Sequence, residues 1–110
     1  MAYYLADQTV TIANGGATSG TCSIVAGAAA QPADFVTVML PAAWTACTIR
    51  LQVSNDDSTW YNLGGTSYTS GTTAASQVLC LRIHGFPHIR LVCSVVQGAE
   101  RSVILRPWRA

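Results

Sequence analysis

The segment 48–54, TIRLQVS, constrains the fold of this chain more than any other, because polar and apolar residues alternate along it. Ile49, Leu51 and Val53 fall on one face of an extended chain, and the residues between them are polar. A period of two is typical of a β-strand with one buried face. Four turn-forming residues follow at 55–58, and an extended pattern resumes at 60–63. The segment therefore predicts a β-hairpin with a polar tip.

The rest of the chain shows no helical period, heptad or internal repeat, and its apolar segments are short. Segment 35–40 is apolar on both faces, as in a central strand, and Pro41 favours one helical turn at 41–44. Inward-facing residues are expected at Val10 and Ile12, and at Ile89, Leu91, Cys93 and Val95. Besides the hairpin, strands are predicted at 8–13, 21–26, 35–40, 77–83, 88–96 and 101–106. The predicted fold is all-β: a single antiparallel, jelly-roll-like β-sandwich of seven or eight short strands.

The length of 110 residues predicts a single domain, 1–110. A chain of this size buries roughly two thirds of its unfolded surface, so it needs no metal or disulfide to hold a core. Its longest apolar run is far shorter than a membrane span, and no membrane partner is expected. The first ten residues lack a basic segment followed by an apolar one. We therefore expect no secretory signal and folding in a reducing cytoplasm.

Charged residues are scarce. Asp, Glu, Lys and Arg make up 10% of the chain, against roughly 25% in an average soluble domain. The basic residues are all Arg. Arg and aromatic residues are enriched at protein interfaces, where Lys and Glu are depleted. This composition predicts a surface largely covered by other subunits; a Ser- and Thr-rich β surface with a codon bias towards Arg is the alternative.

A net charge of +1 argues against a nucleic-acid partner, because proteins that bind nucleic acid usually have a basic stripe on their surface. Arg101, Arg106 and Arg109 lie close together near the C-terminus, without Lys or a nucleic-acid-binding motif between them. We interpret them as residues that contact protein.

The four cysteines, Cys22, Cys47, Cys80 and Cys93, fall in predicted strands or directly beside one. Free cysteine is among the most buried residue types, so reduced core thiols are expected, although three disulfide pairings are open if the chain is oxidised. Cys80 and Cys93, with His84 and His88, have the ligand types of a zinc site. Their spacing lacks the paired halves of such sites, and we expect no metal.

No catalytic arrangement is recognisable. Asp56 and Asp57 are adjacent, so they suit a turn better than two sides of a scissile bond. The glycine-rich segment 15–20 has no following Lys or helix, which argues against a nucleotide site. There is no G-x-S-x-G motif, and a thiol hydrolase using Cys80 or His88 is possible by composition alone. We expect neither enzyme activity nor a cofactor.

The remaining candidates are aromatic residues and the two ends of the chain. Trp60 follows the hairpin tip and is expected to pack in the core. Trp108 lies between two arginines, a composition typical of binding hot spots, and is expected to dock on a neighbouring subunit. Segments 1–7 and 106–110 are candidate contact arms; frayed or self-packed ends are the alternative. The predicted interface residues are Tyr3, Tyr4, Leu5, Trp44, Arg106, Trp108 and Arg109.

Two resemblances involve these segments. LQVSNDDSTWYNL, with the later PHIRLVCS, resembles the strand–turn–strand elements of discoidin-type, galactose-binding-like β-sandwiches over about a third of the chain. TVTIANGG, VMLPAAWTACTIRLQVSNDDSTWYNL, HIRLVCS and ERSVILRPW together are similar to short proteins of tailed-phage structural gene clusters. The Asp56–Asp57 tip replaces the Asp-Gly usual in that group, and the cysteines and terminal RPWRA are also departures.

The second resemblance implies a virion component made in the host cytoplasm: a capsid decoration or cement protein, a head-spike base, or a small tail or fibre module. Its implied partners are the major capsid protein and further copies of the chain, with a trimer favoured. The alternative is a carbohydrate-binding or adaptor module of a tail or fibre, used in host attachment. Segments 55–58 and 64–76 would then supply the glycan site.

Overall fold

The computed structural model describes residues 3–4, 6–23, 33–64, 71–83 and 86–109. These residues form nine antiparallel strands and no helix, which confirms the all-β prediction. Each of the eight predicted strand segments overlaps one of the strands β2–β9; β9 extends beyond its predicted end at residue 106, and the two-residue β1 is additional. The strands are β1 (Tyr3–Tyr4), β2 (Gln8–Ile12), β3 (Cys22–Ser23), β4 (Phe35–Met39), β5 (Ile49–Ser54), β6 (Tyr61–Asn62), β7 (Val78–Arg82), β8 (His88–Cys93) and β9 (Arg101–Arg109).

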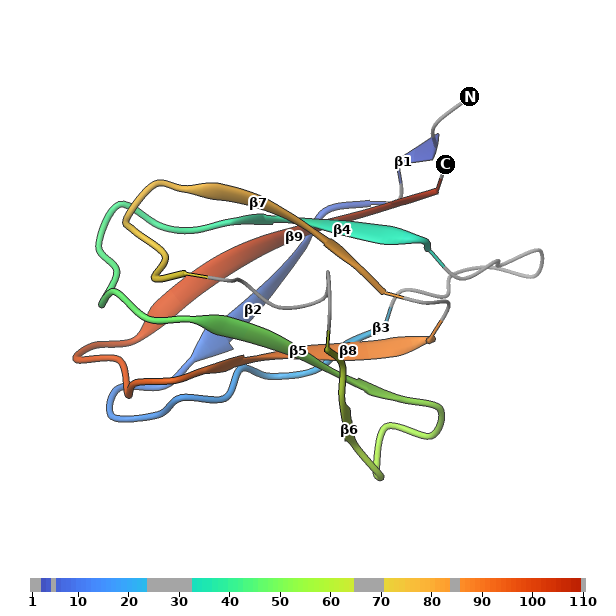
Figure 1. The fold of residues 1–110 in the computed structure, drawn as a ribbon, viewed down its shortest axis with the longest axis horizontal. Coiled ribbons are helices and arrows are strands. Elements are labelled where there is room, and N and C mark those ends of the chain that lie inside the picture. The colour runs from blue at the N-terminus through green and yellow to red at the C-terminus, as the bar shows by residue number, and fades with distance from the viewer. Residues whose placement is uncertain (1–2, 5, 24–32, 65–70, 84–85, 110) are drawn as a thin grey trace.

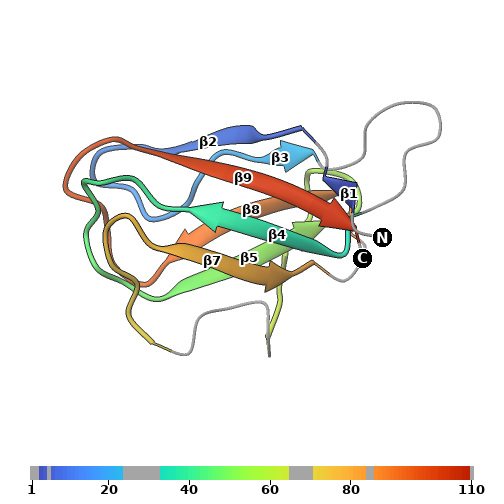
Figure 2. The same ribbon diagram turned by 90° about the horizontal axis from the view of Figure 1, so that it is seen from above.

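The strands lie in two sheets that pack face to face (Figure 1). The five-stranded sheet has the order β1-β9-β4-β7, with β2 also pairing with β9. The four-stranded sheet has the order β3-β8-β5-β6. Viewed from above, β9, β4 and β7 run side by side over β8 and β5 (Figure 2).

The pairing is nested, because β2 pairs with β9, β3 with β8, β4 with β7 and β5 with β6. The chain therefore forms one long β-hairpin, which then wraps so that alternate strand pairs fall in opposite sheets. This arrangement is the eight-stranded jelly roll with two Greek keys. The β-sandwich prediction is confirmed, including its jelly-roll character.

The core fills the space between the sheets. Alternate residues of the longer strands are buried there, as the period of two predicts. Leu51 of β5 lies opposite Leu91 of β8, and both are fully buried. The inward set consists mainly of Val10, Ile12, Val36, Val38, Ile49, Leu51, Val53, Leu81, Ile83, Ile89, Leu91, Val103 and Leu105.

The predicted hairpin forms, with β5 and β6 joined by a polar tip. The Asp56 carboxylate accepts hydrogen bonds from the backbone N–H groups of Ser58 and Thr59, at 3.0 and 2.8 Å. These bonds, together with one from the Ser54 hydroxyl, lower the pKa of Asp56. Asp57 has a φ of 59°, a left-handed conformation that Asp adopts more readily than most residues. Both carboxylates therefore belong to the turn, as predicted.

Two local predictions are wrong. Residues 41–44 form no helical turn; instead the Pro41 carbonyl accepts a hydrogen bond from Ser76, and the Trp44 indole donates to Thr73. Contacts with the 71–77 segment thus replace the bonds within a helix. Val95 does not face the core, because β8 ends at Cys93 and the chain bends there, leaving Val95 46% exposed.

Candidate functional site

The outward side chains of β4, β7 and β9 make a continuous surface on the five-stranded sheet, which we call face A. Strand alternation explains its composition, since the neighbours of these residues in sequence point into the core. We limit face A to the nine such residues where the three strands are paired with one another: Phe35, Thr37, Met39, Val78, Cys80, Arg82, Ile104, Arg106 and Trp108.

The strand register arranges face A in three rows that cross β7, β4 and β9. The first row is apolar, because Met39 pairs with Val78 on one side and Ile104 on the other. Val78 is 63% exposed and Ile104 is 40% exposed. Burying exposed apolar side chains in contact with another molecule is favourable, so this row is the energetic centre of a candidate interface.

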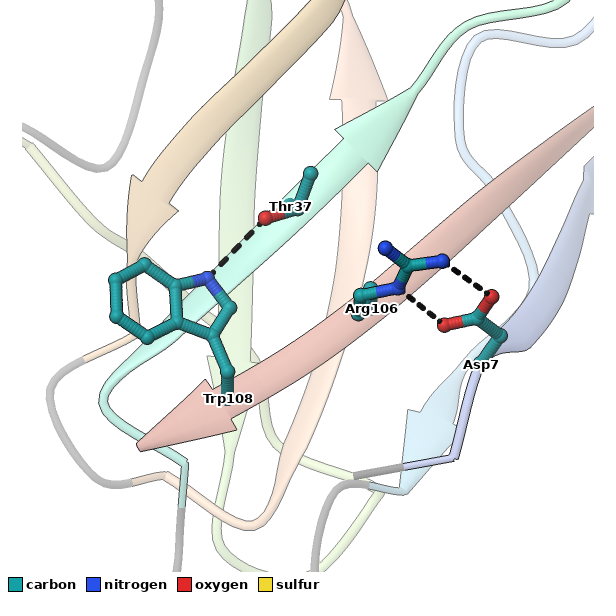
Figure 3. A network of polar contacts seen from close by, with 4 residues as sticks. All are labelled: Asp7, Thr37, Arg106 and Trp108. Atoms are coloured by element: carbon teal, nitrogen blue, oxygen red, sulfur yellow. Dashed lines mark hydrogen bonds and ion pairs between the residues drawn. The ribbon is translucent and has the colours of Figure 1, made fainter. Parts of the chain in front are cut away.

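The third row is an aromatic stack capped by a cation. The rings of Phe35 and Trp108 are stacked with centroids 4.6 Å apart and planes at 20°. The Arg82 guanidinium carbon lies 5.4 Å from the centre of the Phe35 ring, within range of a cation–π interaction. The Trp108 indole N–H donates to the Thr37 hydroxyl at 3.1 Å (Figure 3). Thr37 belongs to the middle row, so this hydrogen bond connects the middle row to the third row.

The middle row carries an ion pair at its β9 end. The Arg106 Nε and the Asp7 Oδ1 are 2.8 Å apart, and a second bond joins the same two groups (Figure 3). Hydrogen bonding to Arg106 lowers the pKa of Asp7. The ion pair is bidentate and neutral overall, so face A presents little net charge at the β9 end of the middle row.

Cys80 lies in the middle row and is exposed, which corrects the expectation that all four thiols are in the core. Its side chain points away from the sandwich because it alternates with the inward Leu79 and Leu81. Cys22 and Cys93 are buried, and burial raises the pKa of Cys22 to about 11 and that of Cys93 to about 12. Their thiolate forms are therefore scarce near neutral pH.

We expect a thiol reagent at neutral pH to modify Cys80 rapidly and the buried Cys22, Cys47 and Cys93 only on unfolding. The Cys80→Ser variant should lose the fast phase and keep the slow one. Stopped-flow absorbance with an aromatic disulfide measures both phases. A fast phase that persists in Cys80→Ser would contradict the assignment.

Most of the described residues in the two predicted arms lie in strands. Residues 106–108 of β9 pair with β4 on one side, and Trp108 and Arg109 pair with Tyr4 and Tyr3 on the other. These residues pack on the domain, since their strands are paired and Trp108 stacks on Phe35, which is the alternative considered for the chain ends. Their contact with another subunit stays a prediction. Leu5 lies outside the described residues. Arg106 and Trp108 remain interface candidates as part of face A.

Trp44 is not near face A. It packs against the core beside the 71–77 segment and is half-buried, with its indole N–H 2.9 Å from the Thr73 hydroxyl. The structure thus brings together only part of the predicted interface set. It adds Phe35, Met39, Val78 and Ile104, which sequence reasoning treated only as strand residues.

A second surface, face B, is the outward side of the four-stranded sheet. It contains a cavity of about 420 Å³ lined by Thr48, Ile49, Arg50, Gln52, Asn62, Val92, Cys93 and Ser94. Trp60 is half-buried and is not part of the buried core, which corrects its predicted position. The Arg90 guanidinium carbon lies 4.4 Å from the centre of the Trp60 ring. The Trp60 ring therefore contacts this cation instead of packing among the core residues.

The structure does not bring together the residues that have the ligand types of a zinc site. Cys80 is exposed on the five-stranded sheet, whereas Cys93 is buried in the four-stranded sheet. His84 lies outside the described residues. Among the residues that the structure does describe, no group of three or more His, Cys, Asp or Glu is placed to hold a metal ion. The same part of the chain contains no helix of the length and hydropathy needed to cross a membrane.

No protein-family model matches the chain, and no curated protein matches it significantly. Solved structures do resemble it. The SPBc2 prophage-derived protein YomS aligns over 94% of this chain and 96% of its own, with a TM-score of 0.56 and 13% identity. PirA aligns over 94% and 93%, with 14% identity, and the Yersinia pseudotuberculosis-derived mitogen over 100% and 88%, with 13% identity; both have a TM-score of 0.49. At this identity, the likeness to YomS establishes a shared fold.

Proposed function

We propose that this protein is a virion structural protein of a tailed phage, which decorates or cements the capsid by binding the major capsid protein and neighbouring copies of itself. The observation that carries the proposal is face A, with its apolar row and its Arg–Phe–Trp stack. The sequence resemblance to phage structural proteins supports the biological setting. The fold shared with a prophage-derived protein is consistent with it.

The chemistry of face A fits a protein interface. Aromatic residues, Met and Arg are the residue types enriched in interfaces, and Lys and Glu are depleted there. Face A contains Phe35, Met39, Trp108 and two arginines. Arg106 is paired with Asp7, which limits the cost of removing that charge from water. The backbone of face A is held by strand pairing, so binding would order few further backbone groups.

The mechanism would be mechanical. A subunit that binds across the boundary between capsomers adds contacts that must break before the shell ruptures, so it stabilises the assembled state by mass action. A trimer or other symmetric cluster would engage several capsid sites at once, and multivalency would turn weak individual contacts into tight attachment. In this proposal the protein has no catalytic role.

The alternative function, a glycan-binding adaptor of a tail or fibre, was predicted to use segments 55–58 and 64–76. The Asp56 carboxylate is occupied by hydrogen bonds within the hairpin tip. Residues 65–70 of the other segment lie outside the described residues. Face A favours the decoration role over a glycan site in these loops.

Adding a charge to the apolar row should abolish attachment. In the Val78→Asp variant we expect co-sedimentation with purified empty capsids to weaken at least tenfold, since the new carboxylate must be desolvated at the contact. The melting temperature should change little because Val78 is 63% exposed.

Val96→Asp is the matched control. Val96 is 55% exposed but lies in the β8–β9 connection, away from face A. Protection of Cys80 from thiol reagents in the capsid-bound state would be a second readout of the same contact. Equal weakening by both valine variants, or a solitary species in analytical ultracentrifugation with no affinity for any virion protein, would overturn the proposal.

A further inference from the structure

An open β-sheet has two edge strands, whose outer backbone groups can pair with another chain unless the edge is short or covered. In the part of the chain that the structure describes, three of the four sheet edges are protected in this way. The four-stranded sheet ends in β3 and β6, which have two residues each. On one side of the five-stranded sheet, β1 has two residues, and β2 is partly covered because the Thr11 carbonyl accepts a hydrogen bond from the Gly20 N–H at 3.0 Å. The remaining edge is β7.

The outer edge of β7 lacks these protections among the described residues. β7 has five residues and pairs with β4, and no described strand pairs with it on its other side (Figure 2). Its sequence, VLCLR, contains neither Lys nor Pro, which often protect edge strands. Val78 is 63% exposed, and Cys80 is also exposed. An exposed apolar edge of this kind is a template for a further strand.

The pairing with β4 shows which backbone groups of β7 face the outer edge. Next to the strand end, the Ile83 N–H donates to the Asp34 carbonyl at 2.8 Å, and these two residues continue the β4–β7 register. In an antiparallel ladder, residues that bond to one neighbouring strand alternate with residues whose N–H and C=O groups point away from it. Leu81 therefore bonds towards β4, whereas the backbone groups of Val78 and Cys80 point to the outer edge.

We propose that the outer edge of β7 pairs with the same edge of a second copy of this chain, as two antiparallel strands related by a two-fold axis at Cys80. In this register Cys80 lies opposite Cys80 of the other copy, and Val78 lies opposite Arg82. The pairing joins the two five-stranded sheets into one. The inference deepens the proposed function, on which its biological role rests, since it names the surface through which neighbouring copies bind.

The residues of β7 favour a second copy in this register. Cys80 is the middle residue of the strand, so a two-fold axis there pairs all five residues with one another. Ser76 has a φ of 59°, which ends the extended backbone and disfavours a register shifted towards the strand start. Arg82 is the one charged residue of β7 and lies roughly 13 Å along the strands from its symmetry mate, so no like charges are opposed.

The same pairing leaves face A open. The side chains of Val78 and Cys80 stand out of the sheet plane, so pairing at the edge engages their backbone groups and not their side chains. Two copies of face A then lie side by side on one surface, with Cys80 at their boundary. The dimer presents both copies to a capsid, and bivalent attachment is tighter than attachment through a single face.

The first test is sedimentation velocity of the reduced full chain over a wide range of concentration. The contact is small beside a standard protein interface, because it consists mainly of one strand from each copy. We therefore expect a reversible equilibrium between monomer and dimer, with the dimer favoured at high concentration. A chain that stays monomeric at every concentration, or that sediments as a trimer, would contradict the proposal.

Cys80→Pro tests the edge itself. The variant removes an N–H group that points to the outer edge and makes no bond to β4, a position where edge strands accept proline. The loss acts once in each copy, and we expect dimerisation to weaken at least tenfold. Cys80→Ala is the matched control, because it removes the same thiol but keeps the N–H, and it should dimerise like the wild type. If Cys80→Pro does not fold, Cys80→Lys replaces it, since it places two like charges opposite each other.

Oxidised glutathione tests the register. In a hydrogen-bonded antiparallel pair the two Cα atoms are about 5.5 Å apart, within the roughly 4.4–6.8 Å that a disulfide spans. Two Cys80 thiols and one oxidised glutathione give one intermolecular disulfide and two reduced glutathione molecules. We expect the native wild type to cross-link rapidly. Val78→Cys in a Cys80→Ser background controls for random collision, because its cysteines are roughly 13 Å apart in this register and should cross-link slowly.

Equally fast cross-linking of the two cysteine positions would refute the register. A folded Cys80→Pro variant that dimerises as tightly as the wild type would place the contact elsewhere. A monomeric wild type whose capsid binding is lost in Cys80→Pro would assign the edge to a strand of the capsid protein instead.

The capsid role is tested separately. Val78→Asp should lose capsid attachment and keep the dimer, because its carboxylate lies opposite Arg82 of the other copy. Loss of the dimer in this variant would count against the register. A monomeric chain that still co-sediments with capsids refutes the dimer alone, and a dimer with no affinity for capsids refutes the capsid role alone.

Discussion

Replacing Leu91 by alanine is expected to lower the free energy of unfolding by about 3 kcal/mol, since a fully buried leucine loses its contacts and leaves a cavity that neighbouring residues refill only in part. Leu91 lies in β8 directly opposite Leu51 of β5, and both strands are internal to the four-stranded sheet. Neither side chain is exposed to solvent. For a domain whose total stability is on the order of 5–15 kcal/mol, this loss is large.

Urea unfolding followed by circular dichroism measures the effect, as a lower midpoint with an unchanged slope. Val92→Ala is the control, because Val92 is the next residue along β8 but faces outward and is only half-buried. Its effect should stay below about 1 kcal/mol. Equal losses at the two positions would mean that the inward face of β8 is not the packed core.

Replacing Gln97 by alanine is expected to destabilise the protein by about 2–3 kcal/mol, as buried polar groups would lose their partners. The Gln97 side chain is fully buried and bridges the Thr45 backbone: its Oε1 accepts from the Thr45 N–H at 2.9 Å, and its Nε2 donates to the Thr45 carbonyl at 3.1 Å. Arg101 also donates to the Oε1. The Gln97 backbone exchanges hydrogen bonds with the turn at Gly15 and Gly16.

Gln97 therefore joins three connections: the turn after β2, the segment before β5 and the segment between β8 and β9. Gln97→Met separates hydrogen bonding from volume, because methionine fills the space without polar partners. We expect it to be nearly as destabilising as Gln97→Ala, and the Thr45 amide to exchange faster in both variants. Gln77→Ala, which removes an exposed glutamine bonded to Ala74, should cost little. A Gln97→Met variant as stable as the wild type would show that packing alone matters there.

The alternation of residue types was enough to predict the strands, because the period of a strand is a local property of the backbone. Val10, Ile12, Val36, Leu51, Ile89 and Leu105 are all buried in predicted strands. The turn role of Asp56 and Asp57 was equally local. The helical turn at 41–44 failed because contacts with a segment some thirty residues later determine its backbone.

The candidate sites depended on long-range pairing, which no local pattern contains. Val78, Met39 and Ile104 become one apolar row only because β7, β4 and β9 are neighbours in a fixed register. Trp108 looked like a free anchor in sequence because the strand that pairs with it lies about seventy residues earlier. The hydrogen bonds that join Arg90, Gln52 and Asn62 on face B likewise require three strands to lie side by side.

The sequence by itself determined that this chain is an all-β sandwich with few charged residues. Alternation and turn residues act locally, and composition is a property of the whole chain, so none of these signals depends on which segments meet in the fold. The tertiary structure decided which outward residues meet, that the C-terminal segment is a paired strand, and that Gln97 is a buried link between three connections. The physical reason is that the neighbours of a strand's outward side chains belong to the adjacent strands, and the register between strands is set by the packing of the whole core.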